Sequence, residues 1–218
     1  MDTTTFLIWS LGALGAYLLG AIPFGYLIAR SRGVDIRTVG SRNTGATNVF
    51  RCVGKPWGIA TFVLDLAKGA ASCRLLPWVV AQTAGTTTGF AITPYHVICG
   101  CLAVVGHNWP VFLGFRGGKG IATSAGMLIG LSPLGVAIAL VVWIVVFVTS
   151  RYVSVATISA ATTMGVVVWP LHLKTHGIWF PAVLTLLALL AIWKHRSNIA
   201  RLRAGTESRF EFGKKGRS

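Results

Sequence analysis

The sequence predicts an all-α integral membrane protein, a polytopic helical bundle of about seven transmembrane segments. Hydrophobic residues make up 54% of the 218 residues and charged residues 11%, a composition outside the usual range of soluble globular proteins. Several apolar stretches are about as long as the roughly 20 residues that a membrane-crossing helix needs. Lys and Arg are concentrated between these stretches, as they are in the cytoplasmic loops of membrane proteins.

The clearest apolar stretches predict four membrane-spanning helices, at 6–29, 88–108, 152–170 and 178–193. The first of them is longer than the apolar core of a signal peptide, and no Lys or Arg precedes it. We therefore expect it to stay in the mature protein as a membrane span.

A fifth stretch, about 57–80, also predicts a membrane-spanning helix, although it contains charged residues. Asp65 and Lys68 are three residues apart, which makes them neighbours on one face of a helix. Because a charge inside the membrane needs a partner, we interpret them as a buried or near-interface ion pair that orients the helix.

The stretch 121–149 is too long for one upright helix and is interrupted by turn-prone residues at 131–133. It is either one tilted helix or a short half-helix followed by a full span. Positive charge decides between these alternatives: 30–56 holds six Lys and Arg, 109–120 holds two, and the tail from Lys194 holds eight. These three regions can share the cytoplasmic side only if 121–149 crosses the membrane twice.

This count predicts a topology with the N-terminus outside and the C-terminus in the cytoplasm. The sequence has no internal repeat and no low-complexity linker, so we expect one membrane-embedded domain over 1–218. The net charge of +15 favours anionic partners. We expect membrane lipid among them and no nucleic acid.

The first of three polar segments is GSRNTGATNVFR at 40–51. It offers hydroxyl groups, side-chain amides, two guanidinium groups and the accessible backbone of its glycines. Nearly every one of these groups donates hydrogen bonds, so the segment suits phosphate or carbonyl oxygens.

The second polar segment is GHNWPVFLGFRGGKGIAT at 106–123. Glycines allow the backbone to approach an anion, the following helix presents free amides at its start, and Lys119 adds positive charge. The segment is not a Walker A loop, because Gly120 follows the lysine where that motif has Ser or Thr. A glycine-rich turn without a ligand is the simpler alternative for this segment.

The third polar segment is KHRSNIARLRAGTESRF at 194–210. His195 and Asn198 are three residues apart and face the same way on a helix that continues from the last span. A single interfacial histidine is often only a helix-end residue, but its pairing with Asn198 beside two donor-rich segments favours a functional role.

Metal ligands are poorly represented in these segments. Carboxylates are few, and the four cysteines have no CxxC spacing. His172 and His176 are four residues apart, but no Glu follows His172 and no third ligand is evident, so a loop or interface position is favoured over a metal site. We therefore expect no metal and no cofactor.

The three segments, in this order and separated by apolar spans, resemble the motifs of the bacterial membrane acyl-phosphate:glycerol-3-phosphate acyltransferases. The resemblance includes GKPWG at 54–58 and covers essentially the whole chain. It implies a seven-helix protein of the bacterial inner membrane with its active site on the cytoplasmic side. It also implies transfer of the acyl group of an acyl phosphate to the sn-1 hydroxyl of glycerol 3-phosphate, giving lysophosphatidic acid and phosphate. The enzyme that supplies the acyl phosphate is an expected partner.

The resemblance also implies roles for individual residues. Those expected to act in catalysis are Ser41, His195 and Asn198. Those expected to bind substrate are Asn43, Asn48, Arg51, Gly117, Gly118, Lys119 and Gly120. Glu207 is expected to have a structural role, paired with a nearby arginine.

Two alternatives remain open from the sequence. The general base is either His195 or a phosphate group of the substrate, and the lack of a nearby Asp to orient the histidine slightly favours the substrate. The competing function is a transporter of a phosphorylated anionic solute, because broken helices and cationic loops also serve anion passage. The basic residues are all expected on one face of the membrane, which favours the enzyme.

Overall fold

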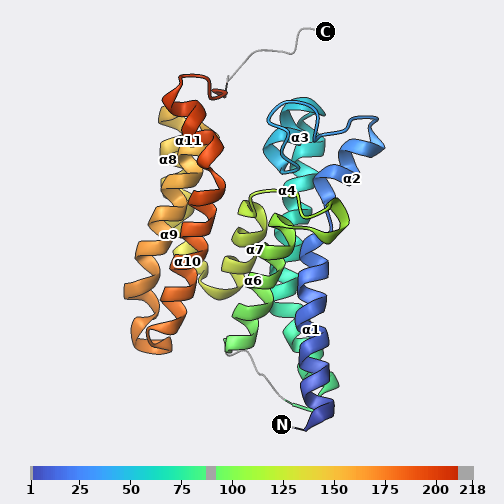
Figure 1. Cartoon of the computed structure of the whole chain (residues 1–218). Coiled ribbons are helices and arrows are strands. Elements are labelled where there is room, and N and C mark those ends of the chain that lie inside the picture. Colours follow the sequence, from blue (N-terminus) through green and yellow to red (C-terminus); the bar gives the residue numbers. More distant parts are fainter. Residues whose placement is uncertain (1, 87–91, 211–218) are drawn as a thin grey trace. The chain divides into compact units, whose positions relative to one another are not determined.

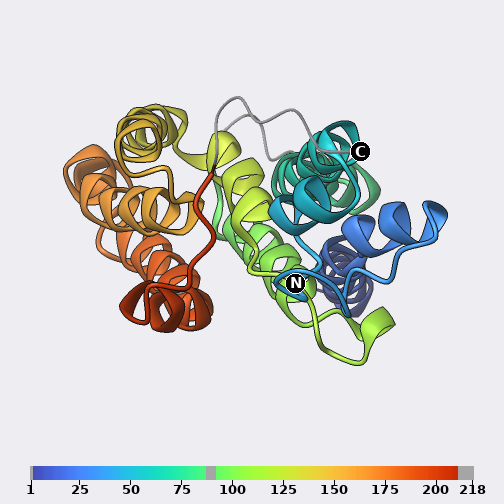
Figure 2. The ribbon, with the colours of Figure 1, turned by 90° about the horizontal axis from the view of Figure 1, so that it is seen from above.

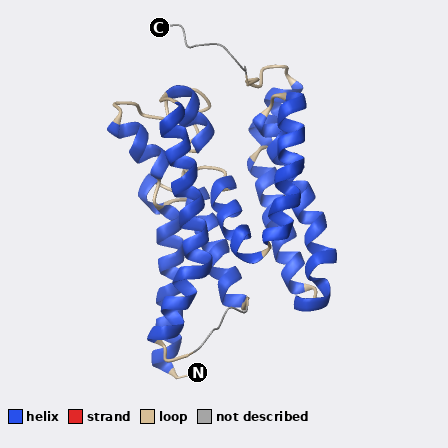
Figure 3. Cartoon of the chain, turned by 180° about the vertical axis from the view of Figure 1, so that it is seen from behind, coloured by secondary structure: helices blue, strands red, loops and turns tan. Residues whose placement is uncertain are grey.

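The structure, a computed structural model, describes residues 2–86 and 92–210, and within these ranges every regular element is a helix (Figure 3). The longer helices are α1 (Thr3–Ala21), α4 (Lys55–Ala70), α6 (Pro94–Asn108), α7 (Ile121–Leu131), α8 (Pro133–Ser150), α9 (Val153–His176) and α10 (Trp179–Lys194). The shorter elements are α2 (Phe24–Ser31), α3 (Ala46–Cys52), the π-helix η1 (Ala71–Leu75), α5 (Leu76–Thr83), the 3-10 helix η2 (Val111–Leu113) and α11 (Arg196–Arg203). The all-α prediction is confirmed for these residues.

Among the described residues, four helical stretches are long and apolar enough to cross a membrane: Thr3–Ser31, Pro94–Leu113, Pro133–Ser150 and Val153–His176. Two further apolar helices, Ile121–Leu131 and Trp179–Lys194, are shorter. The chain is therefore a multi-pass membrane protein. The predicted start of one span, at 88, lies outside the described residues.

The predicted span at 6–29 is divided into α1 and α2 (Figure 1). The break falls at Ile22 and Pro23, because proline has no backbone N–H to donate and its ring disfavours helical geometry in the residue before it. Ile22 accordingly has a ψ of 116°, outside the helical region. The break leaves the Ile22 carbonyl near the side chain of Lys68, whose Nζ donates to it at 2.8 Å.

The stretch 121–149 forms two helices, α7 and α8, separated at Ser132. Pro133 begins α8, where its missing N–H costs no helical hydrogen bond. The half-helix followed by a longer helix is therefore the correct alternative. Sequence reasoning ended the next span at 170, whereas α9 continues through Pro170 to His176, so His172 and His176 are helical and not in a loop.

Contacts between Cα atoms group the chain into two compact units, Met1–Leu131 and Ser132–Ser218. In the first unit α1 packs along α6, and α4 packs along α3 and α7. In the second unit α9 packs against both α8 and α10, which lie beside it in Figures 1 and 2. The prediction of a single domain over 1–218 stays a prediction, because two compact units can belong to one domain.

Small residues bring α1 and α6 into close contact. A Cβ atom at Gly20 would overlap the backbone of Ala103, and one at Gly106 would overlap the Tyr17 carbonyl oxygen. In membranes, where lipid is as apolar as the helix surface, such close packing is a main source of helix association. The contact fixes the end of α6, and with it His107, beside the break between α1 and α2.

Candidate active site

The first polar segment runs from an irregular loop into the start of α3. Ser41 and Arg51 are exposed, and Asn43 is half-buried. The Asn43 side-chain oxygen accepts a hydrogen bond from the Gly45 amide at 2.9 Å, which closes a local turn just before the helix. Hydroxyl and guanidinium donors therefore stand at the surface of this segment.

Asn48 has a different setting, since it is almost completely buried. Its amide nitrogen donates to the carbonyl oxygens of Ile36, Val39 and Asn43 at 3.2, 3.1 and 2.9 Å. Its side-chain oxygen accepts from the Ser41 amide at 2.9 Å. Asn48 thus organises the loop that presents Ser41, while its role in binding substrate stays a prediction.

The second polar segment folds back onto the end of α6. The Gly118 amide donates to the His107 carbonyl oxygen at 3.1 Å, and a Cβ atom at Gly118 would overlap the His107 imidazole at Nε2. Glycine is therefore required there by close approach. Lys119 follows as a half-buried residue, and α7 begins two residues later, with the Ser124 amide donating to the Gly120 carbonyl at 2.7 Å. The segment places Lys119 next to the amino end of a helix, where anions bind well.

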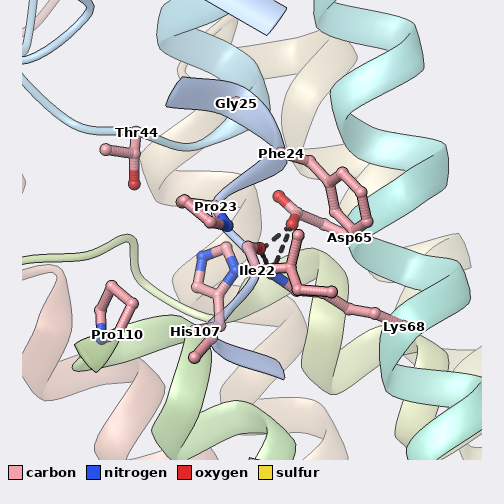
Figure 4. Close-up of a pocket in the computed structure, with 10 residues that line it drawn as sticks. Ile22, Pro23, Phe24, Gly25, Thr44, Asp65, Lys68, His107 and Pro110 are labelled. Atoms are coloured by element: carbon pink, nitrogen blue, oxygen red, sulfur yellow. Dashed lines mark hydrogen bonds and ion pairs between the residues drawn. The ribbon is translucent and has the colours of Figure 1, made fainter. Parts of the chain in front are cut away.

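Sequence reasoning missed the role of His107, which lies with Asp65 and Lys68 in one buried cluster (Figure 4). Lys68 Nζ is 2.8 Å from Asp65 Oδ1, and His107 Nδ1 is 3.4 Å from the same oxygen. The predicted ion pair is therefore confirmed and buried. In the sequence, His107 is only a histidine at the end of an apolar stretch, and without the fold nothing indicates that it contacts Asp65.

A small pocket adjoins this cluster, and Figure 4 shows Pro23 and Phe24 from the helix break beside it. It also reaches Thr44 of the first polar segment and Pro110 of the second. The pocket has room for about one water molecule and not for a phosphorylated substrate. The pocket shows that the first two polar segments meet, but the residues predicted to bind substrate do not line it.

In the third segment, His195 sits between α10 and α11 and is almost completely buried. Its Nδ1 is 2.8 Å from the Ala191 carbonyl oxygen. A carbonyl oxygen only accepts, so Nδ1 carries the proton, and in the neutral ring Nε2 is the basic nitrogen. This contact fixes the ring plane and the tautomer.

Asn198 is held by Glu207, a residue in the segment after α11. Glu207 Oε1 accepts from Asn198 Nδ2 at 2.6 Å and from Ser154 Oγ at 2.8 Å, while Oε2 pairs with Arg201 Nε at 2.7 Å. Burial alone would raise the pKa of Glu207, but its three donors outweigh burial and hold the pKa below its ordinary value. The carboxylate thereby fixes Asn198 and the start of α9.

These observations divide the predicted site residues between the two units. Segments 40–51 and 106–123 lie in the first unit and meet around Thr44, His107 and Pro110. Segment 194–210 belongs to the second unit. Within the described residues no three His, Cys, Asp or Glu side chains gather as metal ligands would.

The chain is similar to known proteins along most of its length. A family model described as "Glycerol-3-phosphate acyltransferase" matches residues 10–205, a range that includes the first two polar segments and the third as far as residue 205. A glycerol-3-phosphate acyltransferase of Desulforudis audaxviator is 46% identical over 202 residues, covering 91% of this chain and 94% of that protein.

Two solved structures of the membrane enzyme PlsY (YgiH) are similar along most of the chain. The glycerol 3-phosphate form has a TM-score of 0.81 and 36% identity, covering 93% of this chain and 96% of that one. The lysophosphatidic acid form has a TM-score of 0.78 and 35% identity, covering 93% and 95%.

Proposed function

The chain belongs to the glycerol-3-phosphate acyltransferase family and is an acyltransferase, and we propose that it uses an acyl phosphate to acylate glycerol 3-phosphate at the sn-1 hydroxyl. The products are lysophosphatidic acid and inorganic phosphate. The observation that carries this proposal is the likeness to two forms of PlsY, one with glycerol 3-phosphate and one with lysophosphatidic acid. These are the acceptor and the product of such a transfer.

The donor-rich segments support an acyl phosphate as the donor. The acceptor carries one phosphate, the proposed donor carries another, and the leaving group is inorganic phosphate. An acyl phosphate is a mixed anhydride with a good leaving group, so the enzyme mainly has to bring the hydroxyl to the carbonyl carbon and stabilise the developing oxyanion. The new bond joins the glycerol oxygen to the acyl carbon, the anhydride C–O bond breaks, and the hydroxyl proton passes to a base.

We propose that the donors of the first two polar segments bind the substrates. Arg51 and Lys119 supply charge for phosphate oxygens, and the backbone at Gly117, Gly118 and Gly120 allows an anion to approach closely. Ser41 and Asn43 orient a substrate oxygen, and Asn48 acts by shaping their loop. Glu207 is structural and holds Asn198.

His195 and Asn198 are proposed to act where the acyl group is transferred. With Nδ1 donating to Ala191, the neutral His195 presents Nε2 as a base, and the protonated ring would donate from the same atom. The Ala191 carbonyl fixes the plane of the His195 ring. We propose that the substrate phosphate takes the proton and that His195 positions this phosphate.

The site is proposed to face the cytoplasm of a bacterial inner membrane, in a protein of about seven spans with its N-terminus outside. The distribution of Lys and Arg supports this topology. A membrane-impermeant maleimide tests it: a single cysteine at position 2 should react in intact cells, and one at position 206 should react only after lysis. An enzyme that releases an acyl phosphate is the proposed partner, since that donor hydrolyses readily in water.

The experiment for the donor uses purified protein in lipid vesicles with labelled glycerol 3-phosphate. Palmitoyl phosphate should give labelled lysophosphatidic acid, whereas palmitoyl-CoA at the same concentration should not. Analysis of the product should find the acyl chain at sn-1. Product formed only from palmitoyl-CoA would overturn the proposed donor while leaving the family intact. The transporter alternative is not favoured by the family membership, and it predicts uptake of label into sealed vesicles without acylation.

A further inference from the structure

We propose that Asp65 is a positioning residue for the glycine-rich segment 117–120, acting through His107. The inference rests on the proposed function, because it concerns the segment that carries Lys119. It assigns a role to a buried charge that lies outside the three polar segments.

Asp65 lies inside the protein together with Lys68. Its side chain is 3% exposed and that of Lys68 is 2% exposed, on a helix that the sequence predicts to span the membrane. Removing one partner of a buried pair is strongly destabilising, yet replacing the whole pair by apolar residues is often neutral. Stability alone therefore does not require this pair, and an ionisable group at such a place points to function.

Asp65 and Lys68 each also contact a residue outside their ion pair. Asp65 Oδ1 lies 3.4 Å from His107 Nδ1, on the end of α6, and Figure 4 shows the imidazole reaching toward the carboxylate. Lys68 also donates to the Ile22 carbonyl at 2.8 Å, which ties the pair to the break between α1 and α2. The cluster thus joins three elements at one point.

His107 in turn contacts the glycine-rich segment at Gly118. The imidazole edge at Nε2 fills the space that a Cβ atom at Gly118 would need, and the His107 carbonyl accepts from the Gly118 amide at 3.1 Å. The ring is therefore the surface on which Gly118 rests. If Asp65 no longer holds the ring, Gly118 loses this support, and Lys119 beside it moves.

Even a small displacement of the segment matters, because binding sites tolerate little movement of their residues. A misplacement of about 1 Å can reduce catalysis by about 10²-fold. A shift of the His107 ring would displace Gly118, and with it Lys119. Loss of the Asp65 carboxylate should therefore impair kinetics as loss of Lys119 does, and not act mainly by lowering the stability of the fold.

The test compares Asp65→Asn and the double variant Asp65→Asn/Lys68→Met with Asp2→Asn as the matched control. Asn is as good a helix N-cap as Asp, so the control should behave as wild type. The double variant avoids a buried unpaired lysine and so separates positioning from folding. Thermal unfolding in detergent establishes that each variant is folded.

Kinetics supply the first readout. The double variant should lower kcat/KM by at least about tenfold, chiefly by raising KM for the same substrate whose KM rises in Lys119→Ala. Combining it with Lys119→Ala should add little to the loss, because both changes act on one segment. Combining it with Asn198→Ala, in the other unit, should multiply the two losses.

A second readout does not depend on turnover. Arg116 is exposed and lies just before the segment, so trypsin cleavage after Arg116 should be several-fold faster in the double variant than in Asp2→Asn. An unchanged rate of cleavage after Arg116 would overturn the inference. So would losses of kcat/KM that multiply when the double variant is combined with Lys119→Ala, or failure of both Asp65 variants to fold. If wild-type protein makes no lysophosphatidic acid, the proposed function fails separately, and cleavage still decides the role of Asp65.

Discussion

The side-chain amide of Asn198 donates a hydrogen bond of 2.6 Å to Glu207 Oε1. Glu207 lies nine residues further along the chain, so this contact folds the segment after α11 back onto the helix. The same carboxylate accepts a hydrogen bond from the Ser154 hydroxyl at the start of α9 and forms an ion pair with Arg201. One glutamate therefore organises the third polar segment.

The first prediction concerns the pH dependence of this contact. Because the pKa of Glu207 is lower in the folded protein than its ordinary value, the stabilising effect of its ionised carboxylate is fully present above that ordinary value. It is lost as pH falls through the folded-state pKa. As the pH is lowered from 6 through the folded-state pKa of Glu207, the melting temperature of the wild-type protein should thus fall more than that of Glu207→Gln.

Melting temperatures of both proteins in one detergent, measured across that range, provide the check. Asp35, whose pKa Arg37 lowers to about 2, titrates in both proteins and cancels in the difference. Parallel curves for the two proteins would show that Glu207 does not hold the segment.

The second prediction concerns Lys119. Lys119→Ala should lower kcat/KM by about 10- to 100-fold, the value of one charge-assisted hydrogen bond to phosphate, without changing the melting temperature. Lys174→Ala removes an exposed lysine at the end of α9 and should keep wild-type kinetics. Normal KM values for both substrates in purified Lys119→Ala would remove this residue from the site.

The third prediction concerns the general base. If a substrate phosphate accepts the proton, His195→Gln should retain more than about a hundredth of the wild-type kcat, because a general base usually contributes about 10²–10⁴-fold. The kcat of His195→Gln and His195→Ala should be measured between pH 6 and 9. A loss of about 10⁴-fold in both variants would instead make His195 the base.

The fourth prediction concerns the close approach at Gly118. Gly118→Ala should lower kcat/KM, since the new methyl group would overlap His107 and push the segment away. Gly114→Asn is the matched control: Gly114 has a φ of 59° with open space around it, and asparagine tolerates that backbone geometry. Equal activity of the two variants would show that the His107 contact does not set the segment.

The sequence predicted helices well because lipid imposes a simple rule. Apolar length identified every region that became a long helix, and the turn-prone residues at 131–133 identified the division of 121–149. The break at Pro23 was missed because a proline in an apolar run can either kink a helix or end it. Here Lys68 Nζ donates a hydrogen bond to the Ile22 carbonyl oxygen, which stabilises the end of the helix at this position.

The site was predictable only in part, for a related reason. Composition marks the donor-rich segments as anion-binding, but the roles expected for Ser41, Arg51 and Lys119 rest on the family resemblance. Composition cannot tell a donor that faces a ligand from one that is used within the protein, as the amide of Asn48 is. The partnership of Asp65 with His107 joins residues 42 positions apart and required the packing of α4 beside α6.

The most direct test of the central claim is the stoichiometry of the reaction. Purified protein in lipid vesicles receives palmitoyl phosphate with and without glycerol 3-phosphate, in the presence of EDTA, and both phosphate and lysophosphatidic acid are measured. The account predicts phosphate release that depends on glycerol 3-phosphate and equals the lysophosphatidic acid formed, one for one. Phosphate release without glycerol 3-phosphate at the same rate, or no lysophosphatidic acid under these conditions, would contradict it.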